Sequence, residues 1–316
     1  MKLWFDTDPG VDDALALTLL LARPEWQLVG LSSVFGNAGV AQTTRNAAGL
    51  LALLGRPEVP LHRGAAAPLR GEARLAAEVH GGDGLSGLAA ELPGGLAERA
   101  TPAAEALLEA SRREDALHVV AVGPLTNIAQ ALRLDPGLAT RLASLTVMGG
   151  AFGLFGFSGN VSVAAEANVH NDPRAAAEVF AAPWRCLRVV GLDATHRVRI
   201  EPERLEALRH AGGRGAWLWR AVQPYLDFYA AWYGQRVLVA HDATALLALL
   251  DPGLFHWRQG PLRVVEGGLA HGQSLQDWQQ LGRLDPEWCA LPAHAVAQDA
   301  AAEPIIHLCL DAWARP

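Results

Sequence analysis

The sequence has little of several features that mark common protein classes. Its three cysteines, Cys186, Cys289 and Cys309, lie far apart without a CxxC pair, so neither a disulfide framework nor a zinc ribbon is indicated. Lysine and arginine number 26 against 33 aspartates and glutamates, a net charge of −7, which argues against a nucleic-acid partner because nucleic-acid-binding surfaces cluster basic side chains. No GxGxxG follows the first apolar segment, which excludes a dinucleotide-binding fold.

Long apolar runs are also missing, although 51% of the 316 residues are hydrophobic. The most apolar stretch near the start, residues 14–22, falls far short of the roughly 18 residues that a membrane span requires. Lys2 leads directly into an apolar segment and not into a cleavable leader, so we expect a cytoplasmic protein without a membrane partner. Length and composition favour a sizeable buried core.

What the sequence does contain is a repeated order of apolar segment, polar turn and helix. The pattern predicts strands at residues 3–5, 27–35, 117–122, 145–148 and 187–192, and helices that begin near residues 13, 40, 126 and 173. Such alternation indicates an α/β fold with a mainly parallel, Rossmann-like sheet and helices on both faces. No repeat or linker marks a boundary, so residues 1–316 are expected to form a single domain, with residues 64–95 as an ordered excursion or a flap.

The most informative segment is DTDPGVDD at residues 6–13, where four carboxylates crowd the turn between the first strand and the first helix. Two carboxylates about 4 Å apart repel by roughly 4 kcal/mol at an effective dielectric constant of 20, so such a cluster protonates, turns toward water or binds a cation. Helix capping would account for Asp12 or Asp13 alone. It does not account for Asp6 and Asp8, which follow a strand at the edge where open α/β sheets bind ligands. We therefore predict a metal or ligand site here.

Polar side chains also follow other predicted strands, at Asn37, Thr126, Asn127 and Asp193. In a doubly wound sheet these strand ends converge on one crevice. His241 and Asp242 precede an apolar helical run, where Asp242 taken alone would be an ordinary N-cap.

Taken in order, several short motifs closely resemble those of the nucleoside hydrolase family, also called inosine-uridine preferring nucleoside hydrolases. The motifs are DTDPGVDD at 6–13, FGN at 35–37, GPLTN at 123–127, MGG at 148–150, GN at 159–160, AEAN at 165–168, GLDATH at 191–196 and HD at 241–242. The resemblance covers residue 2 to beyond residue 272. It implies the nucleoside hydrolase fold, hydrolysis of the N-glycosidic bond of ribonucleosides to ribose and free base in nucleoside salvage, and a homodimer or homotetramer.

The resemblance also implies roles for individual residues. One Ca²⁺ would be bound by Asp8, Asp13, the backbone carbonyl of Thr126, and Asp242. Asp8 would act as general base toward a metal-activated water that attacks an oxocarbenium-like ribose, and His241 would be the general acid. The implied substrate-binding residues are Asp12, Asn37, His80, Met148, Asn160, Glu166, Asn168 and Tyr229. His170 and His196 are interpreted as structural.

Some departures from the family pattern leave the preferred base open. The family commonly has Thr-Pro before the glutamate and an aromatic residue between glutamate and asparagine, where this sequence has Ser162, Val163 and Ala167. Asn37 in place of aspartate, together with His241, favours a nonspecific or pyrimidine-preferring branch over a purine-restricted one.

Two other functions are compatible with parts of the sequence. A calcium-stabilised nucleoside- or ribose-binding protein without turnover would keep the metal ligands, although it would not need His241 as a proton donor. A haloacid dehalogenase-type phosphatase shares the DxD of residues 6–8, but that class normally continues with Gly-Thr where this sequence has Pro9 and Gly10. An EF-hand is excluded because Leu17 stands where the bidentate glutamate of its loop belongs.

Overall fold

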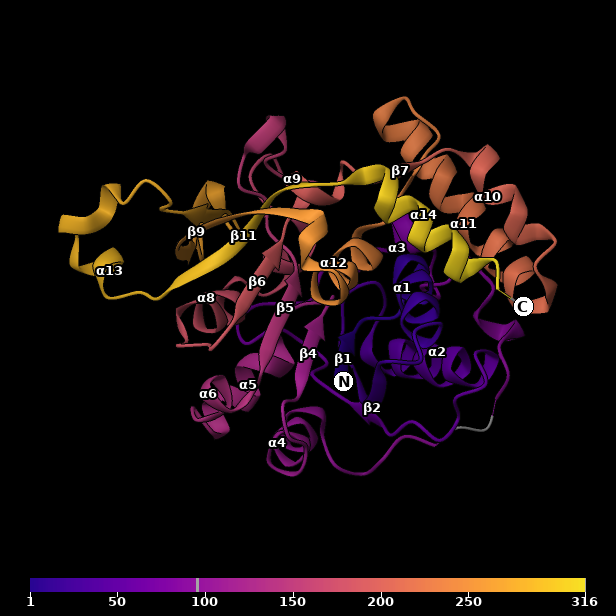
Figure 1. Cartoon of the computed structure of the whole chain (residues 1–316), viewed down its shortest axis with the longest axis horizontal. Coiled ribbons are helices and arrows are strands. Elements are labelled where there is room, and N and C mark those ends of the chain that lie inside the picture. Colours follow the sequence, from indigo (N-terminus) through magenta and orange to yellow (C-terminus); the bar gives the residue numbers. More distant parts are fainter. Residues whose placement is uncertain (95–96, 316) are drawn as a thin grey trace.

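The computed structural model describes residues 1–94 and 97–315. Its main sheet contains β1 (Lys2–Thr7), β2 (Gln27–Ser33), β3 (Leu61–Arg63), β4 (His118–Ala121), β5 (Ser144–Met148), β6 (Leu187–Val190), β9 (Phe255–Val264), β10 (Ser274–Gln276) and β11 (Ala293–Ala300). These nine strands are arranged in the order β10-β9-β11-β6-β5-β4-β1-β2-β3 (Figure 1). Neighbours from β11 to β3 pair in parallel, and only the β9 and β10 pairings at one edge are antiparallel. A separate antiparallel pair joins β7 (Arg199–Ile200) to β8 (Leu238–Val239).

Helices cover both faces of the main sheet. On one side of the sheet, a single buried cluster includes residues of α1 (Val11–Leu21), α2 (Val40–Leu53), α10 (Pro202–Arg209), α11 (Gly212–Tyr233), α12 (His241–Leu250) and α14 (Ala302–Trp313). The other face packs against α4 (Ala103–Arg113), α5 (Thr126–Leu134), α6 (Leu138–Arg141) and α8 (Pro173–Ala181). Four short helices lie in connecting segments: α3 (Ala77–His80), α7 (Ala167–Asn171), α9 (Leu192–Thr195) and α13 (Pro286–Cys289). Because the central strands are covered on both faces, they are apolar along their length and do not alternate.

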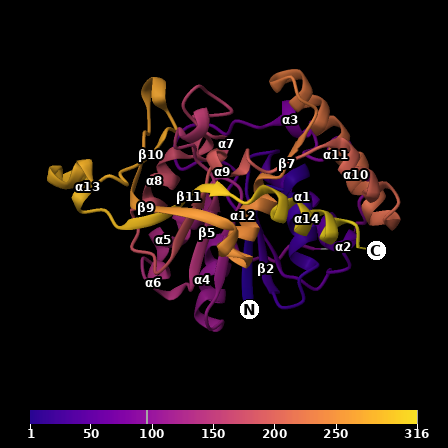
Figure 2. The same ribbon diagram turned by 45° about the horizontal axis from the view of Figure 1, so that its top comes forward.

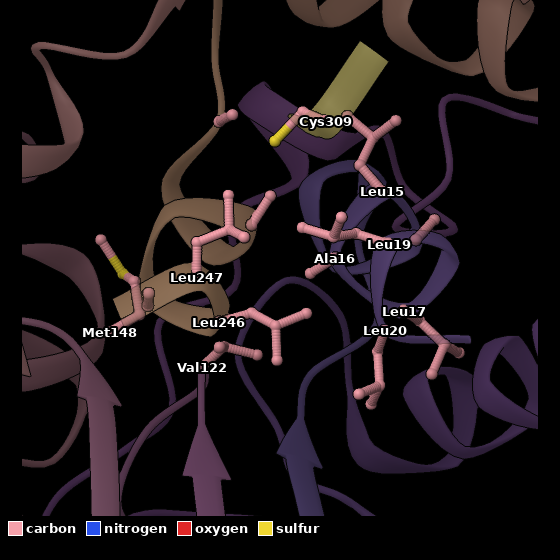
Figure 3. Packing of buried hydrophobic residues seen from close by; sticks show 14 of the residues in the cluster. Leu15, Ala16, Leu17, Leu19, Leu20, Val122, Met148, Leu246, Leu247 and Cys309 are labelled. Carbon is pink, nitrogen blue, oxygen red and sulfur yellow. The ribbon is translucent and has the colours of Figure 1, made fainter. Parts of the chain in front are cut away.

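The packing of α1 against α12 sets the geometry at the carboxyl edge of the sheet. Leu19 of α1 and Leu246 of α12 belong to one buried cluster, which Val122 and Met148 extend at the ends of β4 and β5 (Figure 3). Each helix is apolar almost all around, as expected for a helix enclosed by other elements. Since the acidic residues of both helices lie in their first turns, this apolar contact decides how far apart those carboxylates are.

The predicted fold class is confirmed, with local differences at element ends. The first helix begins at Val11, two residues before the predicted start, and the strand expected over 187–192 ends at Val190 because Leu192 already begins α9. Within the excursion expected at residues 64–95, the described part contains α3 and a 3₁₀ turn at Ala89–Glu91, whereas Gly95 lies outside the described residues.

In the described ranges of the chain, no helix combines the length and the apolar character needed to cross a membrane.

Candidate active site

A pocket lies where the parallel strands end at their carboxyl termini. Of the residues to which the family resemblance gives a role, all except Asp13 and Thr126 line it, namely Asp8, Asp12, Asn37, His80, Met148, Asn160, Glu166, Asn168, Tyr229, His241 and Asp242. Figure 2 shows α3, α7 and α11, which carry parts of its wall, on the side of the sheet away from the N terminus. The structure therefore brings together residues that are up to 234 positions apart, from Asp8 to Asp242, as expected for strand ends that converge on one crevice.

Three carboxylates form a compact buried group on the floor of the site. Asp12, Asp13 and Asp242 each offer one carboxylate oxygen, and these oxygens lie within 4.8 Å of one another. Burial, and then the charges of the neighbouring aspartates, raise the pKa of Asp12 and of Asp242 well above the usual range. Asp12 Oδ1 is buried without any hydrogen-bond partner. Buried, mutually repelling hard oxygen donors of this kind fit a cation such as Ca²⁺.

Asp8 lies beside this group and is held by neighbouring backbone. Its Oδ2 accepts a hydrogen bond from the Asn37 backbone N–H at 2.9 Å. Glycine at positions 36 and 123 is required for this fit, because a Cβ at Gly36 would lie 1.9 Å from Asp8 Oδ2 and one at Gly123 would lie 2.8 Å from Oδ1. Burial, and then the charge of Asp13, raise the pKa of Asp8.

Asp13 serves the helix as well as the acidic group. Its Oδ2 accepts hydrogen bonds from the Gly10 backbone N–H at 2.8 Å and from Asn37 Nδ2 at 2.9 Å, and Oδ1 accepts one from the Thr7 hydroxyl. The capping interpretation therefore holds for Asp13 at the start of α1. Asn37 contacts both Asp8 and Asp13, so it orients two of the predicted metal ligands in addition to lining the pocket.

Asp242 is not the N-cap of α12, contrary to the simplest reading of the sequence. Ala240 occupies the cap position, and Asp242 is the second residue inside the helix, 3% exposed. This placement leaves its carboxylate next to those of Asp12 and Asp13. The N-terminal turn of a helix also favours a negative charge, which partly offsets the crowding.

His241 is buried between two hydroxyl groups. Its Nδ1 lies 2.8 Å from Thr195 Oγ1, and its Nε2 lies 2.7 Å from the Tyr229 hydroxyl. Burial lowers the pKa of His241 well below its usual value, with further contributions from His196 and His80, so the ring is neutral near pH 7. Thr195, which sequence reasoning missed, thus shares a hydrogen-bonded chain with His241 and Tyr229.

His80 combines a structural contact with a place in the pocket wall. Its Nδ1 accepts a hydrogen bond from the Val11 backbone N–H at 3.2 Å, which leaves the proton on Nε2, 4.0 Å from Asp12 Oδ1. Burial lowers the pKa of His80 to about 3. A neutral His80 therefore anchors the first turn of α1 and presents an N–H group toward Asp12.

The wall opposite α11 is built around Glu166, the N-cap of α7. Glu166 accepts hydrogen bonds from the backbone N–H groups of Asn168, Val169 and Gly150 at 2.8, 3.1 and 2.9 Å. Asn168 Nδ2 donates to the carbonyl oxygens of Val122 and Met148, and Asn160 Oδ1 accepts from the Ala167 backbone N–H. These bonds fix polar side chains along a wall on which a sugar could be bound.

Two predicted strand-end residues point elsewhere. The Thr126 hydroxyl donates to Asp172 Oδ2 at 2.7 Å, and the role of its backbone carbonyl as a ligand stays a prediction. Asp193, which we expected in the same crevice, instead accepts hydrogen bonds from the Phe152 and Leu154 backbone N–H groups and tethers that loop. The structural interpretation of His170 is incomplete, because His170 also lines the pocket.

Other lining residues were not predicted, among them Arg74, Leu75, Glu78 and Asn171. Tyr225, Phe228, Trp232 and Tyr233 also line the pocket, and they belong to the segment 225–233, which the family resemblance implies to be a wall over the base. The aromatic members recur along α11 at three- and four-residue spacing, a pattern that sequence alone assigns to core packing. Their position beside the pocket depends on how α11 packs against α1, α3 and β8, for which the sequence carries no local signal.

Beneath the pocket, Asn127 connects three segments. Its Nδ2 donates to Asp6 Oδ1 at 2.7 Å and to the Ser33 carbonyl at 3.0 Å, and its Oδ1 accepts from the Ala65 backbone N–H at 2.8 Å. Asn127→Ala is expected to destabilise the protein by about 2–4 kcal/mol, because it leaves several buried polar groups unpaired. Urea unfolding measures this loss, with Asn171→Ala, whose side chain makes an exposed hydrogen bond to Arg74, as control. Equal losses in the two variants would contradict the special role of Asn127.

Comparisons with known proteins agree with this geometry. The profile of the family described as inosine-uridine preferring nucleoside hydrolase matches residues 3–304. A probable uridine nucleosidase 1 from Oryza sativa subsp. japonica is 37% identical over 278 residues, 87% of this chain and 85% of that protein. The pyrimidine-specific ribonucleoside hydrolase RihA from Klebsiella pneumoniae is 34% identical, with 89% and 90% covered. A solved plant nucleoside hydrolase, PpNRh1, superimposes with a TM-score of 0.94 at 33% identity, covering 100% of this chain and 99% of that one. The chain therefore belongs to the inosine-uridine preferring nucleoside hydrolase family.

Proposed function

We propose that this enzyme hydrolyses the N-glycosidic bond of ribonucleosides with the help of one bound Ca²⁺. The observation that carries the proposal is the buried group of Asp12, Asp13 and Asp242, of which Asp12 and Asp242 line the same pocket as the hydrogen-bonded pair of Tyr229 and His241. A cation site and a proton-donating wall are the two elements that cleavage of a bond to a poor leaving group requires.

The ion would be held by Asp8, Asp13, Asp242 and the Thr126 carbonyl. When bound, Ca²⁺ would orient a water molecule and lower its pKa. Asp8 would be the general base for the attacking water, because the Asn37 backbone N–H holds its carboxylate in the pocket wall. The unpaired Oδ1 of Asp12 is free to accept a hydrogen bond from a ribose hydroxyl.

The second wall would hold the rest of the sugar. Asn160, Glu166 and Asn168 line the pocket, and each is already oriented by bonds to backbone. As the base departs, positive charge develops on the ribose ring, and the surrounding carboxylates stabilise that charge more than they stabilise the neutral substrate. Binding energy is thereby directed to the transition state.

The departing base would lie against α11 and α12. His241 is hydrogen-bonded to the Tyr229 hydroxyl at Nε2 and to the Thr195 hydroxyl at Nδ1. Because burial favours the neutral ring, His241 takes up one proton from solvent before the step; its Nε2–H then gives a proton to the Tyr229 oxygen while the Tyr229 hydroxyl gives its own to the departing base, which returns His241 to the neutral form. General-acid assistance of this kind is worth about 10²- to 10⁴-fold in rate.

His241→Ala is expected to lower kcat about 10²- to 10⁴-fold for natural nucleosides and far less for 4-nitrophenyl riboside, whose leaving group needs no proton. Steady-state kinetics on both substrates measure the difference. Tyr229→Phe, which keeps the ring but removes the hydroxyl, is expected to show the same selectivity. Equal losses on the two substrates would show that His241 positions the substrate and does not protonate it.

Pyrimidine nucleosides are the proposed substrates, because the relatives described above are named as a uridine nucleosidase and a pyrimidine-specific hydrolase.

We also propose that residues 1–316 act as one domain, since β9 and β11 near the end of the chain complete the sheet that β1 begins. The oligomer is proposed to be a homodimer or homotetramer, which light scattering would measure. The phosphatase alternative is excluded by family membership.

The test is release of free ribose from uridine, cytidine, inosine and adenosine, with and without a strong calcium chelator. Metal-dependent release that is fastest for uridine or cytidine is the expected result. If nucleosides raise the melting temperature without any release of ribose, the non-catalytic calcium-stabilised binding protein is the correct reading. Fastest release from a purine nucleoside would overturn the base preference alone.

A further inference from the structure

A second cavity lies at the amino-terminal edge of the sheet, where β6 and β11 begin. Its volume is about 460 Å³, and its lining includes Arg185, Cys186, Arg188, Pro252, Trp257 and His294. The active-site pocket lies at the opposite, carboxyl edge of the same strands. A cavity of this size falls within the range of small-molecule sites, about 300–1,000 Å³.

The charge of this cavity differs from that of the protein as a whole. The chain has a net charge of −7, yet no aspartate or glutamate is found among the described residues that line the cavity. In residues 1–94 and 97–315, neither the Arg185 nor the Arg188 guanidinium makes a hydrogen bond or an ion pair. Two arginines without an acidic partner thus share one concave surface.

The Arg188 guanidinium lies over an aromatic ring that also lines the cavity. Its guanidinium carbon lies 5.7 Å from the centre of the Trp257 ring, a cation–π arrangement. Stacking occupies the face of the guanidinium and leaves its in-plane N–H groups available, and these match the oxygens of phosphate in a bidentate manner. Arg185, three residues earlier and exposed, provides the second positive charge.

We propose that this cavity binds the phosphate group of a small phosphorylated metabolite between Arg185 and Arg188, with the remainder of the molecule against Trp257. Two guanidinium groups balance a phosphate monoester, which carries about −1.5 to −2 charges at pH 7. The proposal does not depend on the proposed function, because no residue of the hydrolytic site takes part.

Cys186 lines the cavity and serves as a local reporter, while exposed Cys289 provides an internal control. In the wild-type protein, inorganic phosphate and ribose 5-phosphate are expected to slow iodoacetamide labelling of Cys186 by about tenfold at ten times Kd, following the factor 1 + [L]/Kd. Labelling of Cys289, followed by peptide mass spectrometry, should not change. Ribose 5-phosphate should protect at the lower concentration because of its contact with Trp257.

Two substitutions test the assignment of the anion site. Arg185→Gln and Arg188→Gln are each expected to raise the phosphate concentration needed for protection of Cys186 at least about tenfold. Each variant loses a charge-assisted hydrogen bond to the phosphate, and a loss of this size is typical of such bonds. Arg209→Gln is the matched control. The Arg209 guanidinium carbon lies 5.0 Å from the centre of the Trp219 ring, and Arg209 does not line this cavity. Ribose release should be unchanged in all three variants.

Three results would overturn the proposal. The first is equal protection by sodium chloride or acetate at the same ionic strength, which indicates screening. The second is equal weakening in Arg209→Gln, which indicates a general charge effect. The third is a Cys186 that does not react even without phosphate, because the cavity is then covered, for example by a second copy of the chain.

Discussion

Asp8→Asn is expected to lower kcat for ribonucleoside hydrolysis by about 10³-fold or more, since it would remove both the proposed general base and a charged ligand of the proposed metal ion. The change is isosteric, so the hydrogen bond from the Asn37 backbone N–H to the retained side-chain oxygen can persist. Burial and Asp13 raise the pKa of Asp8, so an ionised Asp8 destabilises the metal-free fold. The variant should therefore melt no lower than the wild type when both are metal-free.

The measurements are steady-state kinetics with uridine and thermal melting with and without chelator. Asp227→Asn is the matched control, because Asp227 lies on pocket-lining α11 but forms an exposed ion pair with Arg236. It should retain wild-type kcat. Near-normal turnover by Asp8→Asn would rule out Asp8 as general base and would require another carboxylate of the group to take that role.

Removal of the metal is expected to abolish ribose release and to reverse the usual dependence of stability on pH. In the metal-free protein, burial and mutual repulsion raise the folded-state pKa of Asp8, Asp12 and Asp242 above the ordinary value of 3.8. The folded state then binds more protons than the unfolded state. This contribution to stability is fully present below the ordinary pKa and is lost as pH rises through the raised values.

Asp6, beneath the pocket, adds to the same trend, because burial raises its pKa to about 6. The free energy of unfolding of the chelated protein should thus fall as pH increases from about 4 to 8. Saturating Ca²⁺ should offset the loss, since a ligand at 100 times its Kd stabilises the folded state by about 2.7 kcal/mol.

Urea unfolding across this pH range, with chelator and with Ca²⁺, measures both effects. If the free energy of unfolding of the chelated protein rises with pH instead, this result contradicts mutual repulsion within the acidic group. Full turnover after chelation would contradict metal dependence. If Mg²⁺ restores turnover to the chelated protein as effectively as Ca²⁺ does, the assignment of the ion is wrong, because Mg²⁺ demands a smaller and more regular set of ligands.

The sequence indicated the fold class and the polar residues at the centre of the pocket, because both leave local patterns. Strands such as β4 and β5 are short apolar runs followed by polar turns, and DTDPGVDD at residues 6–13 places carboxylates at a strand end. Asn127 and Asp242 were correctly singled out as polar residues next to strand ends or helix starts. Their partners could not be predicted, because Asn127 contacts Asp6 across 121 positions and His80 contacts Val11 across 69.

By itself, the sequence determined the alternation of five central strands with helices, the acidic turn after β1 and the resemblance to a family, since these depend on residue type and short-range spacing. The tertiary structure decided which carboxylates meet. Packing of α1 against α12 brings Asp242 to Asp12 and Asp13, and α11 brings Tyr229 to His241. These distances result from many apolar contacts between segments distant in sequence, and no local pattern encodes such contacts.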